Sequence, residues 1–213
     1  ASVRDEVVGL EGVPSYNIIV VVNESWGKHH SLPFYGHDTD AMPFLSDWID
    51  SESDSFLVFN QAFSNSTATD VSMPSLLTGV NPHERVAALH RKPFVWDWAK
   101  AAGYETFFVT SQRYRSINPF FTSKGLDHFY GSLEMEAPIV NDMGADDLFS
   151  IQTVNRLIKE SKGPFFGVFN TNAMHSPCQK TSKFADVPFS LESNYEKSEY
   201  IVDRAIKSLV KTL

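Results

Sequence analysis

The chain has 213 residues, of which 42% are hydrophobic and 21% charged, and these values suit a globular protein with a sizeable core. Its formal net charge of -8, with no run of Lys and Arg, argues against a nucleic-acid partner. The single cysteine, Cys178, excludes an intrachain disulfide, and no apolar stretch is long enough to span a bilayer.

Strand-like and helix-like segments alternate along the chain. Residues 1–16 are polar without a clear period and are expected to form a leader or linker, followed by one domain over residues 17–213. Runs of β-branched and aromatic residues predict strands at 17–23, 56–59, 106–109 and 165–169. Apolar stripes predict helices at 42–51, 69–77, 94–102 and 195–213, and a further helix that Asp146 caps and whose stripe is Leu148, Ile151, Val154 and Ile158.

This alternation predicts an α/β fold with a largely parallel central sheet and helices on both of its faces. The strands at 18–22 and 165–169 are expected to be interior strands, because their near-continuous apolar character requires cover on both faces.

The carboxyl ends of parallel strands are where active sites form in such sheets. Glu24 follows the first predicted strand, and residues 64–69 follow the second. Residues 110–115 and 170–175 follow the third and the fourth. These four ends carry a carboxylate, a cluster of hydroxyls, two arginines and a histidine.

Two of these side chains suit metal-assisted nucleophilic chemistry. A carboxylate fixed at a strand tip, as at Glu24, is a good ligand for a divalent metal, although a turn or helix cap is an equal alternative. The Thr69 hydroxyl begins a predicted helix, where the backbone favours negative charge, and a metal on the hydroxyl would make it a nucleophile. The alternative is a Ser/Thr-rich turn followed by an ordinary helix cap. The residues alone leave both readings open.

Three segments between residues 17 and 79 resemble the phosphoethanolamine transferases and sulfatases of the alkaline phosphatase superfamily. They are the strand ending in Val-Val-Asn-Glu-Ser, the segment Ser-Leu-Pro-Phe-Tyr-Gly-His-Asp-Thr-Asp-Ala-Met-Pro-Phe-Leu at 31–45, and Thr-Ala-Thr-Asp-Val-Ser-Met-Pro at 67–74. The resemblance implies that Glu24 is a metal ligand and that Thr69 is both the nucleophile and a metal ligand.

The sulfatase signature, Cys-x-Pro-Ser-Arg followed by Leu-Leu-Thr-Gly, aligns without a gap when its Cys is placed on Thr69. Ser72 then falls on the signature Ser, and residues 76–79 fall on Leu-Leu-Thr-Gly. A threonine cannot be converted to formylglycine as the sulfatase nucleophile is, and Met73 replaces the signature Arg, so sulfate-ester hydrolysis is disfavoured. Asn65 and Ser75 stand where many lipid-A phosphoethanolamine transferases have cysteines, which argues against lipid A as the acceptor.

The resemblance continues after residue 79. Residues 102–109 and 124–131 are similar to sulfatases and lipoteichoic acid synthases, in which the intervening loop contacts the substrate head group. Arg113 and Arg115 lie in that loop and are candidate phosphate ligands, with solvated surface arginines as the alternative. His175, in Asn-Ala-Met-His-Ser-Pro, resembles a family histidine that faces the substrate phosphate or a second metal, with a structural histidine as the alternative.

Taken together, the resemblance implies a metal-dependent phosphotransferase that moves a phosphoethanolamine or phosphoglycerol head group from a phospholipid donor to a glycan or lipid acceptor through a phosphothreonine. The alternatives are a related phosphodiester or sulfuric-ester hydrolase, or a non-catalytic domain of this fold. The expected cofactor is zinc, with manganese, magnesium and calcium as further options. The resemblance also implies an extracytoplasmic domain, periplasmic or at the cell surface, of a bacterial protein whose membrane anchor lies outside this sequence.

The family completes its main metal site with an Asp-His pair beyond the helix that corresponds to residues 195–213, and no Asp-His-Gly segment occurs here. The chain is therefore expected to represent about the N-terminal two-thirds of a catalytic domain. Two oxygen ligands hold zinc poorly without imidazole, so the 213 residues alone are expected to bind zinc weakly.

Overall fold

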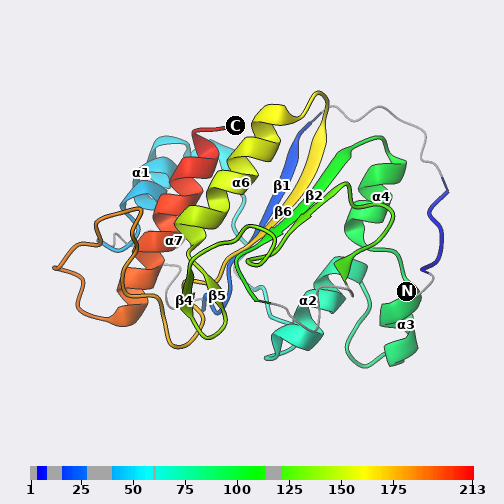
Figure 1. Ribbon diagram of the computed structural model, residues 1–213, viewed down its shortest axis with the longest axis horizontal. Coiled ribbons are helices and arrows are strands. Elements are labelled where there is room, and N and C mark those ends of the chain that lie inside the picture. Colours follow the sequence, from blue (N-terminus) through cyan, green and yellow to red (C-terminus); the bar gives the residue numbers. More distant parts are fainter. Residues whose placement is uncertain (1–3, 9–15, 28–39, 60, 114–120) are drawn as a thin grey trace.

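The computed structural model describes residues 4–8, 16–27, 40–59, 61–113 and 121–213. A central sheet of four parallel strands has the order β1 (Ile18–Val22), β6 (Phe165–Asn170), β2 (Glu105–Thr110) and β3 (His128–Tyr130). Figure 1 shows α1, α6 and α7 on one side of this sheet and α2 and α4 on the other. The predicted α/β class, with a parallel sheet covered on both faces, is confirmed.

The remaining elements connect and cover these strands. The helices are α1 (Pro43–Ser51), the short 3-10 helix η3 (Ser53–Ser55), α2 (Thr69–Thr78), α3 (Val86–Arg91), α4 (Val95–Ala101), α6 (Asp147–Glu160) and α7 (Asn194–Val210). The strands β4 (Ile139–Asn141) and β5 (Gly144–Ala145) form a small antiparallel pair. Among the described residues, no helix combines the length and apolarity that crossing a bilayer requires.

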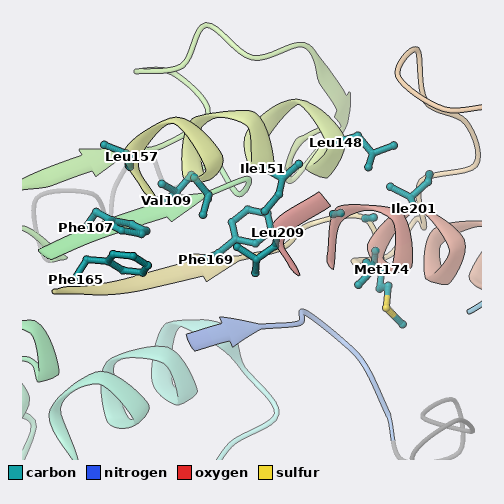
Figure 2. Close-up of a cluster of buried hydrophobic side chains, with 14 residues drawn as sticks. Phe107, Val109, Leu148, Ile151, Leu157, Phe165, Phe169, Met174, Ile201 and Leu209 are labelled. Carbon is teal, nitrogen blue, oxygen red and sulfur yellow. The ribbon is translucent and has the colours of Figure 1, made fainter. Parts of the chain in front are cut away.

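Two apolar clusters lie on opposite faces of the sheet. Figure 2 shows the larger one, in which Phe107, Val109, Phe165 and Phe169 of the sheet meet side chains of α6 and α7. The smaller cluster joins Phe108, Phe166 and Val168 to α2 and α4, and its helix residues are Met73, Leu77 and Trp96. The alternation of side chains along each strand sends successive residues to the two clusters, which fixes the register of the sheet.

A glycine allows the two central strands to pack closely. Gly167 on β6 pairs in register with Phe107 on β2, and a Cβ atom at Gly167 would collide with the Phe107 ring. Because that ring is buried in the larger cluster, it has little freedom to move aside. The absence of a side chain at position 167 is therefore a packing requirement of the sheet.

Two predictions about strands need correction. Residues 56–59 are not a strand but an irregular segment, and Leu57 and Phe59 are 81% and 72% exposed. The strand β1 is parallel, as predicted, yet it lies at one edge of the four-stranded sheet, with Ile18 and Val20 partly exposed. Among the described strands, β6 is interior, as predicted, whereas β1 is not. A run of apolar residues predicts that a segment is buried, but it does not predict which strands the segment pairs with.

The helix starts agree more closely with the sequence. Asp146 caps α6 by accepting a hydrogen bond from the Leu148 backbone N–H at 2.9 Å, as predicted. α2 begins at Thr69, contains Pro74 and ends at Gly79, whose φ of 71° is the left-handed conformation that terminates many helices. α1 has no cap of its own; the Asp203 carboxylate of α7 accepts hydrogen bonds from the Phe44 and Leu45 backbone N–H groups instead.

The described part of the predicted leader packs on the domain. The Arg4 guanidinium lies 3.6 Å from the centre of the Phe94 ring and donates to the Leu89 carbonyl at 2.8 Å. The domain boundary near residue 16 stays a prediction, and these contacts indicate that residues 4–8 are not a free tether.

Candidate active site

Glu24 and Thr69 meet beyond the carboxyl end of β1. The Thr69 hydroxyl, on the first residue of α2, lies 3.3 Å from Glu24 Oε1 and 3.5 Å from Glu24 Oε2. The strand end supplies the carboxylate, and the helix start supplies the hydroxyl in the region where the helix dipole favours negative charge. The two residues are 45 positions apart in sequence, so the contact is a product of the fold.

The Glu24 carboxylate receives two further hydrogen bonds. Gln112 Nε2 donates to Oε2 at 2.8 Å, and the Ser25 hydroxyl donates to Oε1 at 3.1 Å. The Gln112 side chain is buried, and Gln112 is the second residue after β2. The strand-end rule selected the segment that contains Gln112, but reasoning from charge favoured the arginines that follow it. The amide was missed because glutamine carries no charge and forms no motif.

Thr171, the first residue after β6, ties the ends of two neighbouring strands together. Its hydroxyl accepts a hydrogen bond from the Glu24 backbone N–H at 3.1 Å, and its own backbone N–H donates to the Val22 carbonyl at 3.0 Å. Glu24 is thus held both through its main chain and through its carboxylate. Sequence reasoning did not single out Thr171.

His175 lies further along the loop after β6, at the same edge of the sheet. Its Nδ1 is 2.8 Å from the Ser176 carbonyl oxygen, and Nδ1 is the donor in this contact because a carbonyl oxygen only accepts. No hydrogen bond links His175 to Glu24 or Thr69 within the described part of the chain. The convergence of all three residues on one pocket therefore stays a prediction for His175.

A buried carboxylate fixes the start of the His175 loop. Asp147 accepts hydrogen bonds from the backbone N–H groups of Asn172 at 2.9 Å and Ala173 at 2.8 Å. Burial raises the pKa of the Asp147 carboxyl to about 6. The hydroxyl of Ser182 donates to Asp146 at 2.6 Å, so both acidic residues at the start of α6 anchor this loop.

The two candidate phosphate-binding arginines have different outcomes. The Arg113 backbone N–H donates to the Met143 carbonyl at 2.7 Å, and its half-buried side chain makes no hydrogen bond or ion pair with Glu24 or Thr69 among the described residues. Arg115 lies outside the described residues. A phosphate-binding role for either arginine remains a prediction.

The geometry at Glu24 and Thr69 suits two ligands of one metal ion. Two oxygens bound to zinc at about 2.1 Å with a tetrahedral angle lie about 3.4 Å apart, and the observed separations are 3.3 and 3.5 Å. No group of three His, Cys, Asp or Glu side chains that could hold a metal occurs within the part of the chain that the structure describes. The described residues therefore fit a part of a metal site rather than a complete one.

Comparison with known proteins agrees with the fold and the motif. The sulfatase family model matches residues 16–213, and the chain belongs to the sulfatase family. A search of curated protein sequences found no match.

Solved structures with a similar fold include a protein of the alkaline phosphatase superfamily and domains of phosphoethanolamine transferases. A superfamily protein from Vibrio parahaemolyticus matches with a TM-score of 0.69 and 20% identity over 95% of this chain and 52% of its own. The C-terminal periplasmic domain of EcEptC from Escherichia coli, in complex with Zn, has a TM-score of 0.67 and 18% identity over 94% of this chain and 60% of its own. The soluble domain of lipooligosaccharide phosphoethanolamine transferase A from Neisseria meningitidis has a TM-score of 0.66 and 16% identity, over 99% of this chain and 65% of its own.

These similarities show the fold, since each identity is below 25%. The chain spans between about half and two-thirds of the length of these neighbours.

Proposed function

We propose that this domain carries the nucleophile of a phosphotransferase that moves a phosphoethanolamine or phosphoglycerol head group from a phospholipid to a glycan or lipid acceptor. The observation that carries the proposal is the contact between the Thr69 hydroxyl and the Glu24 carboxylate at 3.3 Å. Both residues lie in the segments whose sequence resembles phosphoethanolamine transferases, and the soluble domain of one such transferase shares the fold.

The proposed reaction has two steps at the Thr69 oxygen. In the first, this oxygen forms a bond to the donor phosphorus while the bond from phosphorus to the diacylglycerol oxygen breaks; the Thr69 hydroxyl loses its proton, the departing oxygen gains one, and the head-group phosphate is left on Thr69. In the second, an acceptor hydroxyl oxygen attacks the same phosphorus with loss of its proton, the bond from phosphorus to the Thr69 oxygen breaks, and the Thr69 hydroxyl regains a proton. Water in place of the acceptor would make the domain a phosphodiesterase, and this is the closest alternative.

The chain's own residues would hold the reacting groups. Glu24 orients the Thr69 hydroxyl, and Gln112 and Ser25 keep the Glu24 carboxylate in place. The N-terminus of α2 adds a favourable field for the incoming phosphate. His175 is proposed to face that phosphate through Nε2, because Nδ1 is engaged with the Ser176 carbonyl, and Nε2 would donate to a phosphate oxygen in the protonated ring.

Glu24 and Thr69 are the residues that would hold the metal, which we propose to be zinc because one structural neighbour is a Zn complex. A bound zinc ion would lower the pKa of a coordinated hydroxyl and neutralise charge on the phosphate. By analogy with the neighbours that are periplasmic or soluble domains of transferases, we place the domain outside the cytoplasm, close to a membrane that supplies the lipid donor.

Turnover of a chromogenic phosphodiester by the full-length gene product tests this function. Thr69→Ala should reduce zinc-dependent turnover to background, because it removes the oxygen that forms the bond to phosphorus. Thr69→Ser is the matched control, since it keeps the hydroxyl, and it should retain measurable turnover. Undiminished turnover in Thr69→Ala would exclude Thr69 as the nucleophile. An aryl sulfate should give no turnover in any variant.

A further inference from the structure

The turn that carries Glu24 has an unusual backbone. Glu24 and Ser25 are the second and third residues after β1, and Ser25 has a φ of 55°, in the left-handed region that residues other than glycine rarely adopt. This conformation accompanies the hydrogen bond from the Ser25 hydroxyl to Glu24 Oε1. A turn in a disfavoured conformation needs contacts from elsewhere in the fold to maintain it.

One side chain of α7 supplies such contacts. The Tyr195 hydroxyl donates a hydrogen bond to the Ser25 carbonyl at 2.9 Å and accepts one from the Gly27 backbone N–H at 3.4 Å. A single phenol thus holds two points of the turn, one residue and three residues after Glu24. Burial raises the pKa of the Tyr195 hydroxyl to about 12, so it remains a donor throughout the neutral range.

The tyrosine is itself held in a fixed place. It lies in the first turn of α7, where Ser193 and Glu196 form a capping box: the Glu196 backbone N–H donates to the Ser193 hydroxyl at 3.0 Å, and the Ser193 backbone N–H donates to the Glu196 carboxylate at 2.8 Å. Its ring packs against the larger apolar cluster. The rigid helix start therefore presents the hydroxyl to a turn 170 residues earlier in the sequence.

We propose that Tyr195 is a positioning residue of the active site, which acts by fixing the turn from Glu24 to Gly27 so that the Glu24 carboxylate faces Thr69. The contacts that the Tyr195 hydroxyl makes with the turn are to backbone groups, so its proposed effect on chemistry passes through the position of Glu24. The proposal rests on the proposed function in so far as it takes Glu24 to be a metal ligand.

Tyr195→Phe removes the hydroxyl and keeps the ring, so the variant should fold. Tyr200→Phe, on the same helix, is the matched control, and Glu24→Gln reports whether Glu24 binds the metal at all. Zinc affinity of the full-length gene product is measured by competition with a chromophoric chelator. Loss of a group that orients a metal ligand typically weakens affinity about 10- to 100-fold, and this is the loss expected for Tyr195→Phe but not for Tyr200→Phe.

A second measurement needs no metal. In the metal-free 213-residue chain, a nuclear Overhauser effect between the Thr69 methyl group and the Glu24 side-chain methylene protons reports that the two residues face each other. We expect this signal in the parent and in Tyr200→Phe, and its loss in Tyr195→Phe at an unfolding temperature close to that of the parent.

The outcomes separate the two proposals. If Glu24→Gln weakens zinc binding and Tyr195→Phe matches the parent in both measurements, the positioning role is overturned and the proposed function stands. If Glu24→Gln leaves zinc affinity unchanged, the proposed metal site fails, and the Overhauser signal alone decides the role of Tyr195. A Tyr195→Phe variant that loses affinity only together with a large fall in unfolding temperature would show a structural role and contradict the proposal.

Discussion

At the scale of single residues, the candidate site is built from hydrogen bonds between segments far apart in sequence. Glu24 receives bonds from Thr69, 45 residues away, and from Gln112, 88 residues away. A carboxylate with several donors has one preferred orientation, and this orientation is what a metal ligand or a nucleophile's partner requires. The Asp203 carboxylate on α7 is oriented in the same way, because it accepts hydrogen bonds from two backbone N–H groups at the start of α1.

Asp203 gives a prediction about pH. Burial raises the pKa of its carboxyl to about 6, against smaller opposing effects of its hydrogen bonds to Leu45 and Phe44 and of the Arg204 and Lys207 charges. Between about pH 4 and pH 6 the Asp203 carboxyl is therefore protonated in the folded protein but ionised in the unfolded chain, where its pKa is near 4. The free energy of unfolding therefore falls as the pH rises from about 4 to about 6, and this contribution is fully lost above the folded-state pKa.

Asp203→Asn removes this titration and keeps one acceptor oxygen. The stability of the variant relative to the parent should improve by up to about 3 kcal/mol as the pH rises from 4 to 7. Urea denaturation of both proteins at several pH values measures the difference between their free energies of unfolding. All other titrating groups are shared by the two proteins, so their effects cancel in this difference. A difference that does not change with pH would contradict the burial argument.

At the scale of elements, the sheet depends on how closely β2 and β6 approach. Gly167 and Phe107 are paired across these strands, and the space that a Gly167 side chain would need is filled by the Phe107 ring. The sequence predicted both strands but gave no sign of this contact, because the pairing register of two distant strands cannot be read from either alone.

Gly167→Ala should therefore destabilise the protein by about 1–3 kcal/mol, the usual cost of inserting a methyl group into a packed core. Gly163→Ala, just before the same strand, is the matched control, because a Cβ atom there meets nothing within 4 Å. Its effect should stay within about 1 kcal/mol of zero. Chemical denaturation measures both variants; equal stabilities would show that the Phe107 ring moves aside freely.

The errors at the element scale have a common cause. Residues 56–59 have the composition of a strand, yet they form none, and β1 was expected inside the sheet but lies at its edge among the described strands. Composition predicts a preference for extended, buried conformations. Whether such a segment forms a strand, and where in the sheet it lies, depends on which other segment the fold brings next to it. Asp146 was predicted correctly as a cap because capping is a local interaction between near neighbours in the chain.

At the scale of the whole molecule, the fold class and the meeting of Glu24 with Thr69 could be predicted from the sequence. The strand-end rule and the resemblance to a known superfamily both selected these two residues before their distance was known. Gln112, Thr171 and Tyr195 could not be predicted, because each acts through hydrogen bonds to a segment distant in sequence and belongs to no recognised motif. A sequence motif often identifies the functional residue itself. The residues that hydrogen-bond to it can be identified only from the tertiary structure.

The central claim is that Thr69 carries the transferred group. The most direct test is to mix the full-length gene product with zinc and vesicles that contain either phosphatidylethanolamine or phosphatidylglycerol, quench in acid, and analyse the peptide containing Thr69 by mass spectrometry. We expect a phosphoethanolamine or a phosphoglycerol adduct on Thr69, according to the donor used, and no adduct on that peptide in Thr69→Ala. Release of the lipid head group with Thr69 unmodified throughout turnover, at a rate that Thr69→Ala does not change, would contradict it.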